Sequence, residues 1–367
     1  MFILNYPLFS AVFTSKKNIF TERLKRKAVF SALINQNSAQ ILLIFRGIIF
    51  NFVKRFIVKM TNPLFYAKII LFGEYGMIED SQGLVVPYSF YKGTLKFSDL
   101  SSEFELNSNR HLQKYAEYLS VLDLSDDFKL NIEEFKKDIS NGLFFDSNIP
   151  QGYGVGSSGA LVAAIFEKYS INTHDAENIS KDNLKKLKAV FGEMESYFHG
   201  KSSGMDPLIC YMNLPILIEN KENLDRVSIP DGEEGKGAIF LIDSGITGET
   251  GPMIQIFFEK MKTEGFRKTL KEEFIRYNNA CIESFLKKDM NPFFRHLKKL
   301  SHWAYEHFRP MIPESIFKIW KKGLDSNAYY LKLCGSGGGG DILGFTKDYE
   351  KAEKMLDGFQ KEVIYRF

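Results

Sequence analysis

The segment from Pro150 to Leu161 has the residue types of a phosphate-binding loop. Alternating glycines and two serines precede an apolar run, and these residues are Gly152, Gly154, Gly156, Ser157 and Ser158. Glycine lets the backbone turn sharply and approach a ligand, and the free N–H groups at the start of a helix attract anions. We therefore expect a phosphate cradle here. A glycine-rich turn followed by a helix with a serine cap, and no ligand, would show the same pattern.

A second glycine-rich segment, residues 335–341, follows another apolar run near the C-terminal end of the sequence. Neither segment continues into the Gly-Lys-Ser/Thr of a Walker loop, and neither has the Gly-x-Gly-x-x-Gly opening of a dinucleotide site. Transfer of a phosphoryl group also requires a metal ion and a positioned acceptor. We therefore looked for oxygen ligands and for an acid–base group elsewhere in the sequence.

Four side chains could supply this chemistry. Ser158 and Glu195 offer oxygen atoms to magnesium, which takes few protein ligands directly, although periodicity alone favours a solvated helix face for Glu195. Asp206 follows a flexible turn and precedes an expected apolar strand, so it is either a turn residue or a base that accepts a hydroxyl proton. Lys68 interrupts an apolar strand, so it lies at a sheet edge or points at an anion. Beside Asp206, it would keep the carboxylate ionised.

The elements that must position these residues alternate between strands and helices. Strands are expected at residues 65–72, 83–88, 92–97, 143–147, 214–219, 238–243, 329–333 and 342–345. Helices are expected at residues 110–124, from the cradle to about 169, and at 183–199, 252–262, 266–287, 291–306 and 313–323, with a final amphipathic helix from Tyr349. Asp182 is the expected cap of the helix over 183–199, and residues 221–237 are an expected surface loop.

Composition indicates a globular protein of about two domains, because 44% of the 367 residues are hydrophobic and 25% are charged. The net charge is +3, and residues 61–367 contain no basic stripe, so we expect no nucleic-acid partner. Cys210, Cys281 and Cys334 are far apart and odd in number, which fits neither a disulfide framework nor a paired zinc spacing. A reducing, cytoplasmic location is the natural expectation.

Residues 1–59 differ from the rest of the sequence, because they are apolar and basic. Within residues 1–60, ten lysines and arginines stand against one glutamate. Charged residues interrupt the apolar run from Ile41 to Val58, so this run is a poor membrane-spanning helix. An interfacial helix and a transit peptide are the open alternatives. We interpret the segment as an over-long N-terminal extension and expect translation to start at Met60. We expect no membrane association unless the extension is part of the native protein.

Four motifs in order resemble those of the GHMP kinase superfamily, and within it most closely those of the mevalonate kinases. The first is Ala67–Glu74, and the second is the cradle from Pro150 to Ala160. The third in sequence order is His199–Asp206, which resembles His-Gly-x-Pro-Ser-Gly-x-Asp, and the last is Lys332–Asp341. The resemblance covers about residues 64–367. One such motif alone would be weak, but four in order are specific.

The resemblance implies an α+β fold in two domains. Residues 60–245 would form an N-terminal domain like the second domain of ribosomal protein S5, and residues 246–367 a C-terminal ferredoxin-like α/β sandwich. ATP and the acceptor would bind between them. The implied activity is ATP-dependent, Mg²⁺-dependent phosphorylation of a small-molecule alcohol, with the 5-hydroxyl of mevalonate, in isoprenoid precursor synthesis, as the leading acceptor. A homodimer is left open.

The resemblance also assigns roles to individual residues. Asp206 would be the catalytic base and Lys68 would stabilise the developing alkoxide, while Ser158 and Glu195 would hold Mg²⁺. The ATP triphosphate would be lined by Gly152, Gly154, Val155, Gly156, Ser157, Ser158 and Gly159. The acceptor would be bound by Glu74, Tyr75, His199, Ser203, Gly337, Gly338 and Gly339.

Some residues depart from the family pattern, which leaves the acceptor open. Tyr75 replaces the usual histidine after Gly-Glu, Gly159 stands where alanine is usual, and Ser202 where proline is usual. Phosphomevalonate kinases and sugar kinases of the superfamily are close rivals. Diphosphomevalonate decarboxylase would need different motifs. A sensor with the same fold or a membrane-associated protein, neither of them an enzyme, is the alternative of another class, and the presence of Lys68 and Asp206 argues against an inactive sensor.

Overall fold

The computed structural model describes residues 62–367, except residues 173, 175, 177, 178, 221, 222, 231, 233 and 234. The chain divides into two units, Met1–Met60 and Thr61–Phe367, and every described residue belongs to the second. The expectations for residues 1–59 therefore lie outside the described residues. Within the described part, no helix has both the length and the apolar character needed to cross a membrane.

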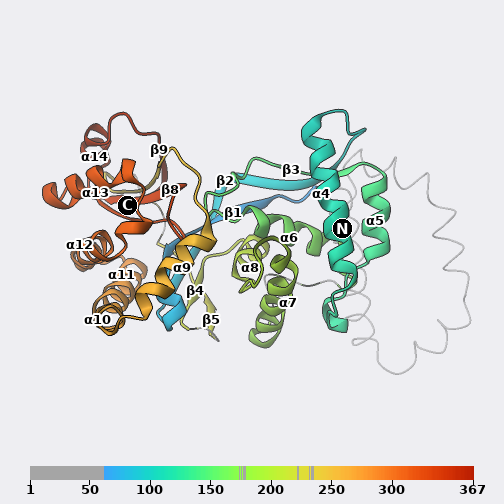
Figure 1. The fold of residues 1–367 in the computed structure, drawn as a ribbon, viewed down its shortest axis with the longest axis horizontal. Helices are drawn as coiled ribbons and strands as arrows, with labels where there is room; N and C mark the ends of the chain where they lie inside the picture. The colour runs from blue at the N-terminus through green and yellow to red at the C-terminus, as the bar shows by residue number, and fades with distance from the viewer. Residues whose placement is uncertain are drawn as a thin grey trace, which may run out of the picture. The chain divides into compact units, whose positions relative to one another are not determined.

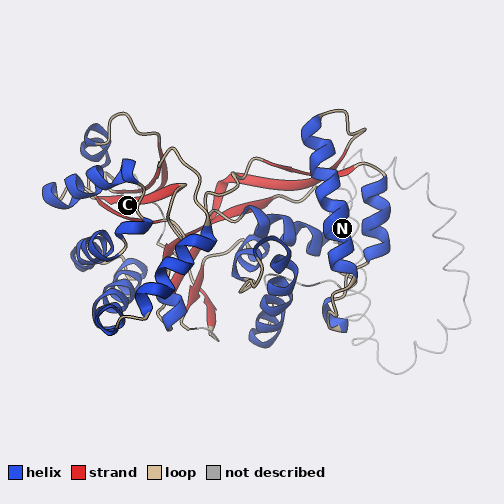
Figure 2. Cartoon of the chain, in the orientation of Figure 1, coloured by secondary structure: helices blue, strands red, loops and turns tan. Residues whose placement is uncertain are grey.

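The first sheet is antiparallel and is built around one long strand (Figures 1 and 2). Its strands are β1 (Phe65–Phe72), β2 (Gly83–Phe97), β3 (Leu143–Ser147), β4 (Ile216–Ile218) and β5 (Leu224–Arg226). The sequence predicts two strands where β2 is continuous. The pairing of β1 with β2 shifts register between Tyr66 and Ala67, which pair with Lys92 and Tyr88. The pairing skips residues 89–91 of β2, which are also the residues between the two predicted strands.

Helices α6 and α8 pack against β1 and β2, and α4 packs against β3. The helices of this half are α4 (Glu103–Ser120), α5 (Ile132–Ser140), α6 (Ser157–Tyr169), α7 (Lys181–His199) and α8 (Met205–Met212), with short 3-10 turns at Gly76–Glu79 and Asp126–Phe128. The expected cap of α7 is wrong, because Ser180 accepts the N–H of Asn183 and is the N-cap.

The strand expected at residues 214–219 is β4, but the residues between Asp206 and this strand form a helix, α8, that the sequence analysis does not predict. Gly204 is the N-cap of α8 in a left-handed conformation, and Pro207 lies in the first turn, where its missing N–H does no harm. Every residue from Pro207 to Met212 is buried. A short apolar run buried on all sides has no periodicity that separates a strand from a helix.

The second sheet is also antiparallel and has the order β7-β8-β6-β9. Its strands are β6 (Ala238–Asp243), β7 (Tyr330–Leu333), β8 (Asp341–Thr346) and β9 (Lys361–Arg366). The sequence analysis places no strand after its final helix, whereas β9 pairs along β6. β6 therefore belongs to the second sheet, and the domain boundary at residue 245 stays a prediction.

The helices of this second half include one continuous helical region with a π-helical segment. They are α9 (Thr250–Met261), α10 (Glu264–Thr269), the π-helical Leu270–Phe274, α11 (Ile275–Leu286), α12 (Met290–His307), α13 (Glu314–Ser326) and α14 (Tyr349–Met355), with a 3-10 turn at Arg309–Met311. Residues 264–286 correspond to the predicted helix over 266–287. The mixture of antiparallel sheets and helices agrees with the predicted α+β class.

Gly204 fixes how α8, and therefore Asp206, meets α7. Its φ is +71°, and a Cβ atom would collide with the carbonyl oxygen of Lys188. We expect Gly204→Ala to lower the free energy of unfolding by about 2–5 kcal/mol, through left-handed strain and overpacking, in a denaturant titration. Gly251→Ala in α9 is the matched control, because nothing lies within 4 Å of the added atom. Equal effects of the two substitutions would contradict this account.

Candidate active site

An ion pair between Lys68 and Asp206 lies at the centre of the site. Lys68 projects from β1 with 2% of its surface exposed, and Asp206 is the second residue of α8. Lys68 Nζ is 2.9 Å from Asp206 Oδ2. Both sequence interpretations of Lys68 hold, because β1 is at the end of its sheet and the side chain points at an anion. The interpretation of Asp206 as a turn residue alone does not account for this pair.

The pair keeps Lys68 charged despite its burial. The largest single effect is desolvation, which lowers the pKa of Lys68. The attraction and hydrogen bond of Asp206, together with the nearby Cys334 and Cys210, outweigh it, so the net pKa of Lys68 is raised. The charged ammonium group of Lys68 therefore faces the Asp206 carboxylate directly. Such a carboxylate can accept a proton from a hydroxyl group.

The cradle lies against Lys68, because β1 is hydrogen-bonded to it. The Lys68 N–H donates to the carbonyl oxygen of Val155 over 2.9 Å. A Cβ on Gly156 would lie 3.0 Å from Lys68 Cγ, so a side chain there would crowd Lys68, and its φ of +87° is strained for any residue except glycine. Gly152, Gly154 and Gly156 all have positive φ, as a cradle of this kind requires. The expected serine cap is wrong, because α6 begins at Ser157 with Gly156 as N-cap and no side-chain cap bond.

Gly159 allows helices α6 and α8 to touch through their backbones. A Cβ at this position would lie 2.8 Å from the carbonyl carbon of Asp206 and 2.9 Å from the nitrogen of Pro207. This close approach gives a physical reason for glycine at a position where the resembling family has alanine. It also means that the first turn of α6 sets the position of the Asp206 backbone.

Glu195 is buried rather than on a solvated face of α7. It is 4% exposed, its Oε1 accepts the hydroxyl of Ser158 at 2.9 Å, and its Oε2 accepts the hydroxyl of Ser202 at 2.5 Å. Burial, followed by the charge of Asp206, raises the pKa of Glu195 to about 7, against the opposing effects of Ser202, Ser158 and Lys68. Ser158 and Glu195, predicted together from the sequence, are therefore in direct contact.

These oxygen atoms fit a magnesium ion. Hydroxyl and carboxylate oxygens are the hard donors that Mg²⁺ prefers, and two protein ligands are enough because it retains waters and binds phosphate oxygens. The negative charges of Glu195 and Asp206 repel each other, and a cation between them would relieve this repulsion. Among the described residues, no group of three or more His, Cys, Asp or Glu side chains could hold a metal ion, so a site here relies on few ligands.

Ser202 is a site residue that the sequence analysis does not identify. Its hydroxyl donates to Glu195 and accepts the N–H of Gly204 at 3.1 Å, which connects α7 to the cap of α8. The only signal in the sequence is its departure from the proline of the family motif. Ser203, predicted to bind the acceptor, is exposed, and its hydroxyl accepts the N–H of Met205 at 3.4 Å. The side chain of His199 lies outside the described residues.

The second glycine-rich segment packs against the first, as a shared phosphate site requires. A Cβ on Gly154 would lie 3.1 Å from the carbonyl oxygen of Cys334, and one on Gly340 would lie 2.9 Å from Tyr153 Cα. A Cβ on Gly339 would lie 2.5 Å from Thr247 C. Gly338 donates its N–H to the carbonyl of Met311. The three glycines predicted to bind the acceptor, Gly337, Gly338 and Gly339, are therefore held by backbone contacts.

Two buried contacts connect the first motif to this segment. Lys332 Nζ lies 2.8 Å from Glu74 Oε2, with both side chains almost fully buried. The hydroxyl of Tyr75 donates to the carbonyl of Ser336 at 2.6 Å, and its ring stacks on Phe257. The sequence analysis quotes Lys332 in a motif without giving it a role. Burial raises the pKa of Glu74, and the charge and hydrogen bond of Lys332 oppose this shift. Removal of Lys332 would leave the buried carboxyl group of Glu74 without this partner, which is costly.

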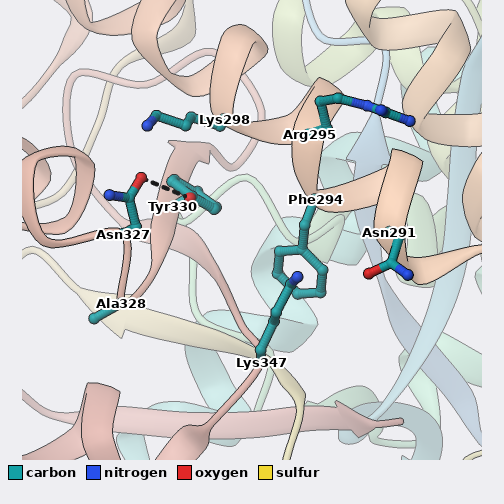
Figure 3. A pocket seen from close by; sticks show the side chains of 8 residues that line it. All are labelled: Asn291, Phe294, Arg295, Lys298, Asn327, Ala328, Tyr330 and Lys347. Carbon is teal, nitrogen blue, oxygen red and sulfur yellow. Dashed lines mark hydrogen bonds between the residues drawn. The ribbon is translucent and has the colours of Figure 1, made fainter.

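A separate basin lies on α12 and β7 and is lined by none of the predicted site residues (Figure 3). It has a volume of about 280 Å³. Phe294 and Tyr330 form a buried part of its wall, and Arg295, Lys298 and Lys347 supply basic groups. The predicted phosphate-binding residues and Asp206 therefore do not belong to this basin.

The pKa of Glu195 has a consequence for stability. Folding raises this pKa from 4.5 to about 7, so the folded state binds a proton more tightly than the unfolded state. The stabilisation is full below about pH 4.5 and is lost as the pH rises through 7. We expect Glu195→Gln, in metal-free buffer, to gain on the order of 1–3 kcal/mol relative to the wild type between pH 5 and pH 8 in denaturant titrations.

Glu193→Gln is the matched control, because Glu193 is an exposed residue of the same helix. Its difference from the wild type is expected to be the same at both pH values. A Glu195→Gln difference that does not change with pH would contradict the assignment of a raised pKa to Glu195.

Comparisons with known proteins place this geometry in a family. The model of the GHMP kinases N terminal domain matches residues 118–213, and the model of the GHMP kinases C terminal domain matches residues 281–364. A search of curated protein sequences finds no match.

Solved structures have the same fold at low sequence identity. The mevalonate kinase of L. major, in complex with R-mevalonate, is 14% identical with a TM-score of 0.56, over 83% of this chain and 96% of that chain. The phosphomevalonate kinase of Streptococcus pneumoniae, in complex with phosphomevalonate and AMPPNP, is 13% identical with a TM-score of 0.56, over 83% of this chain and 100% of that chain. The mevalonate kinase of Methanococcus jannaschii is 16% identical with a TM-score of 0.52, over 84% and 99%.

At such identities the solved structures establish the fold, and the two family models establish membership. The GHMP kinases are ATP-dependent kinases. From its two matched domains and its two-domain fold, this chain belongs to the GHMP kinase superfamily.

Proposed function

We propose that this chain is an ATP-dependent kinase that phosphorylates a hydroxyl group of a small molecule, with the 5-hydroxyl of mevalonate as the leading acceptor. The observation that carries the proposal is the 2.9 Å ion pair between Lys68 and Asp206. Asp206 belongs to α8, whose backbone touches the glycine cradle at Gly159. Membership of a family of ATP-dependent kinases supports it. A charged base beside a phosphate loop is the arrangement that phosphoryl transfer to an alcohol requires.

In this mechanism Asp206 accepts the proton of the acceptor hydroxyl as the oxygen attacks the γ-phosphorus of ATP, the bond to the bridging oxygen breaks and ADP leaves. Lys68 stabilises the negative charge that develops on the oxygen. About one third of the Asp206 side chain is exposed, whereas Lys68 is buried, so the carboxylate is the member of the pair that a substrate can reach. No covalent intermediate on the protein is needed.

The cradle would hold the triphosphate. Gly152, Gly154 and Gly156 bring backbone close to the phosphates, and the N–H groups of Ser157, Ser158 and Gly159 at the start of α6 would donate to them. Ser158 and Glu195 would hold Mg²⁺, which, when bound, neutralises charge on the phosphate oxygens. Because Glu195 must be ionised to serve as a ligand, its raised pKa would make metal binding weaker below about pH 7.

The acceptor pocket is the least constrained part of the proposal. Glu74, Tyr75, Ser203, His199 and the string Gly337–Gly339 remain its predicted residues. The hydroxyl of Tyr75 already donates to Ser336, so Tyr75 would offer its ring rather than a free hydroxyl donor to an acceptor. Mevalonate is favoured because the four motifs resemble those of mevalonate kinases, and one structural neighbour was solved with mevalonate. The three buried free cysteines fit the proposed cytoplasmic location.

Removal of the base gives a direct test. We expect Asp206→Asn to reduce kcat by about 10²–10⁴-fold in an ATP-coupled assay with mevalonate, because asparagine cannot accept the proton. Asp146→Asn is the control, since Asp146 is a partly exposed member of a surface ion pair with Lys96. Both variants should melt cooperatively. An Asp206→Asn enzyme that retains wild-type kcat would exclude the proposed mechanism.

The identity of the acceptor can be tested with a panel of alcohols. We expect kcat/KM to be highest for mevalonate among mevalonate, phosphomevalonate, galactose and homoserine in the same assay. Preference for another member would replace mevalonate but keep the kinase activity. ATP turnover that does not depend on any alcohol would count against a small-molecule kinase.

A further inference from the structure

The basin of Figure 3 is formed by one face of α12 and by the adjoining ends of β7 and β8. Its residues on α12 recur at the spacing i, i+3, i+4 and i+7, which places side chains on one face of a helix, and they are Asn291, Phe294, Arg295 and Lys298. Of the other lining residues, Asn327 precedes β7, Tyr330 begins it and Lys347 follows β8. Segments far apart in the sequence therefore meet at one cavity.

Three positive charges gather at this basin without an acid to balance them. Arg295 and Lys298 lie one turn apart on α12, where like charges are mildly destabilising, and Lys347 adds a third charge from the second sheet. No aspartate or glutamate lines the basin. None of the three cations forms an ion pair within the part of the chain that the structure describes. Several other exposed lysines do pair with an acid, and these are Lys96, Lys129, Lys262, Lys287 and Lys321.

An apolar wall lies beneath these charges and strengthens their field. Phe294 and Tyr330 are 4% and 8% exposed, so protein rather than water lies under the basin. Lys347 Nζ lies 5.1 Å from the centre of the Phe294 ring, and the lysine side chain crosses that ring in Figure 3. A cleft that is lined by one sign of charge and has walls of low polarity concentrates the field and attracts a counter-ion.

An amide group adds a neutral hydrogen-bond donor. The hydroxyl of Tyr330 donates to Asn327 Oδ1 at 3.1 Å, so this oxygen already has a partner. The Nδ2 group of Asn327 has no acceptor among the residues whose positions are described. The basin therefore combines cations with an N–H donor, which is the combination that binds an anion.

We propose that this basin binds a small phosphorylated molecule through its phosphate group. A phosphate is tetrahedral and carries up to about two negative charges at neutral pH, so cations can approach it from several sides at once. Arg295 would pair with two of its oxygens, while Lys298 and Lys347 would act as point charges from the two walls. A carboxylate has one charge and two oxygens in one plane, which suits three such cations less well.

The size of the basin limits the ligand. Its volume of about 280 Å³ lies below the range of roughly 300–1,000 Å³ that is typical of sites for drug-sized ligands. The ligand is therefore smaller than a nucleotide, and this site is distinct from the one proposed for ATP.

The elements that form the basin also support the predicted acceptor residues, and the role that follows rests on the proposed kinase function. β7 continues from Tyr330 to Lys332, which pairs with Glu74. At its other end α12 is followed by Phe308, whose ring centre lies 5.1 Å from that of Tyr75. A ligand that ties α12 to β7 would therefore act on acceptor binding rather than on ATP binding.

Binding is tested by isothermal titration calorimetry on the full chain, without nucleotide, magnesium or acceptor, so that the result does not depend on activity. Pyrophosphate and glycerol 3-phosphate are the probes, and succinate is a dianion without phosphate. At constant ionic strength, we expect saturable binding of both phosphate probes and weaker binding of succinate. The cradle can also hold phosphate, so variants must assign the heat to one site.

Arg295→Gln, Lys298→Gln and Lys347→Gln should each weaken this binding by about three- to tenfold, because each removes one charged contact. Binding to the cradle would persist in these variants. Lys299→Gln is the matched control, since Lys299 is the next residue of the same helix, lies over the ring of Tyr277 and does not line the basin. It removes the same charge and should leave binding unchanged.

Several results would overturn the proposal. Absence of saturable heat with both phosphate probes would exclude the site, and unchanged binding in all three basin variants would assign the heat to the cradle. Equal weakening by Lys298→Gln and Lys299→Gln would indicate non-specific screening of a basic helix. Succinate binding as tight as that of the phosphate probes would exclude a preference for phosphate.

The role is tested separately in the kinase assay. Glycerol 3-phosphate should change KM for mevalonate by about fivefold in the wild type and leave KM for ATP unchanged, and Lys298→Gln should lose this response. A KM for mevalonate that does not respond although the probe binds would contradict the role. If the chain phosphorylates no alcohol, the proposed function fails, while calorimetry still decides whether the basin binds phosphate.

Discussion

The structure depends on the buried cation of Lys68 and the one carboxylate that neutralises it. An ammonium group that is 2% exposed cannot remain charged without a partner, and Asp206 supplies that partner at 2.9 Å. The pair joins β1 to α8, and the Lys68 N–H joins β1 to Val155 in the cradle. The same interaction therefore stabilises this part of the fold and prepares a base beside the expected phosphates.

Glycines make this arrangement sterically accessible. Gly156 leaves room for the stem of Lys68, Gly159 allows α6 to touch the backbone of Asp206, and Gly204 lets α8 begin against α7. A single methyl group would block the contacts at Gly159 and Gly204 and would crowd the stem of Lys68 at Gly156. The glycine-rich composition of the cradle is thus explained twice, by ligand approach and by helix packing, and the second explanation does not require a ligand.

Much of the site follows from the sequence because its residues lie in short motifs. The contact between Ser158 and Glu195, and that between Lys68 and Asp206, are both foreseen from motif order. Local patterns did not show that α8 is a helix, since a short run buried on all sides has no periodicity, although Gly204 and Pro207 were signals for a helix start. Ser202, Lys332 and the meeting of Lys298 with Lys347 at one basin depend on contacts between distant segments, which single-sequence patterns do not contain.

Lys68 and the first turn of α6 both contact Asp206, and the central claim is that this carboxylate receives the proton of the acceptor. A crystal structure with a non-hydrolysable ATP analogue, magnesium and mevalonate would test it most directly. The account predicts the acceptor hydroxyl oxygen within about 3.2 Å of an Asp206 oxygen and in line with the terminal phosphate over the cradle. An acceptor hydroxyl bound away from Asp206, with a different side chain at hydrogen-bond distance, would contradict it.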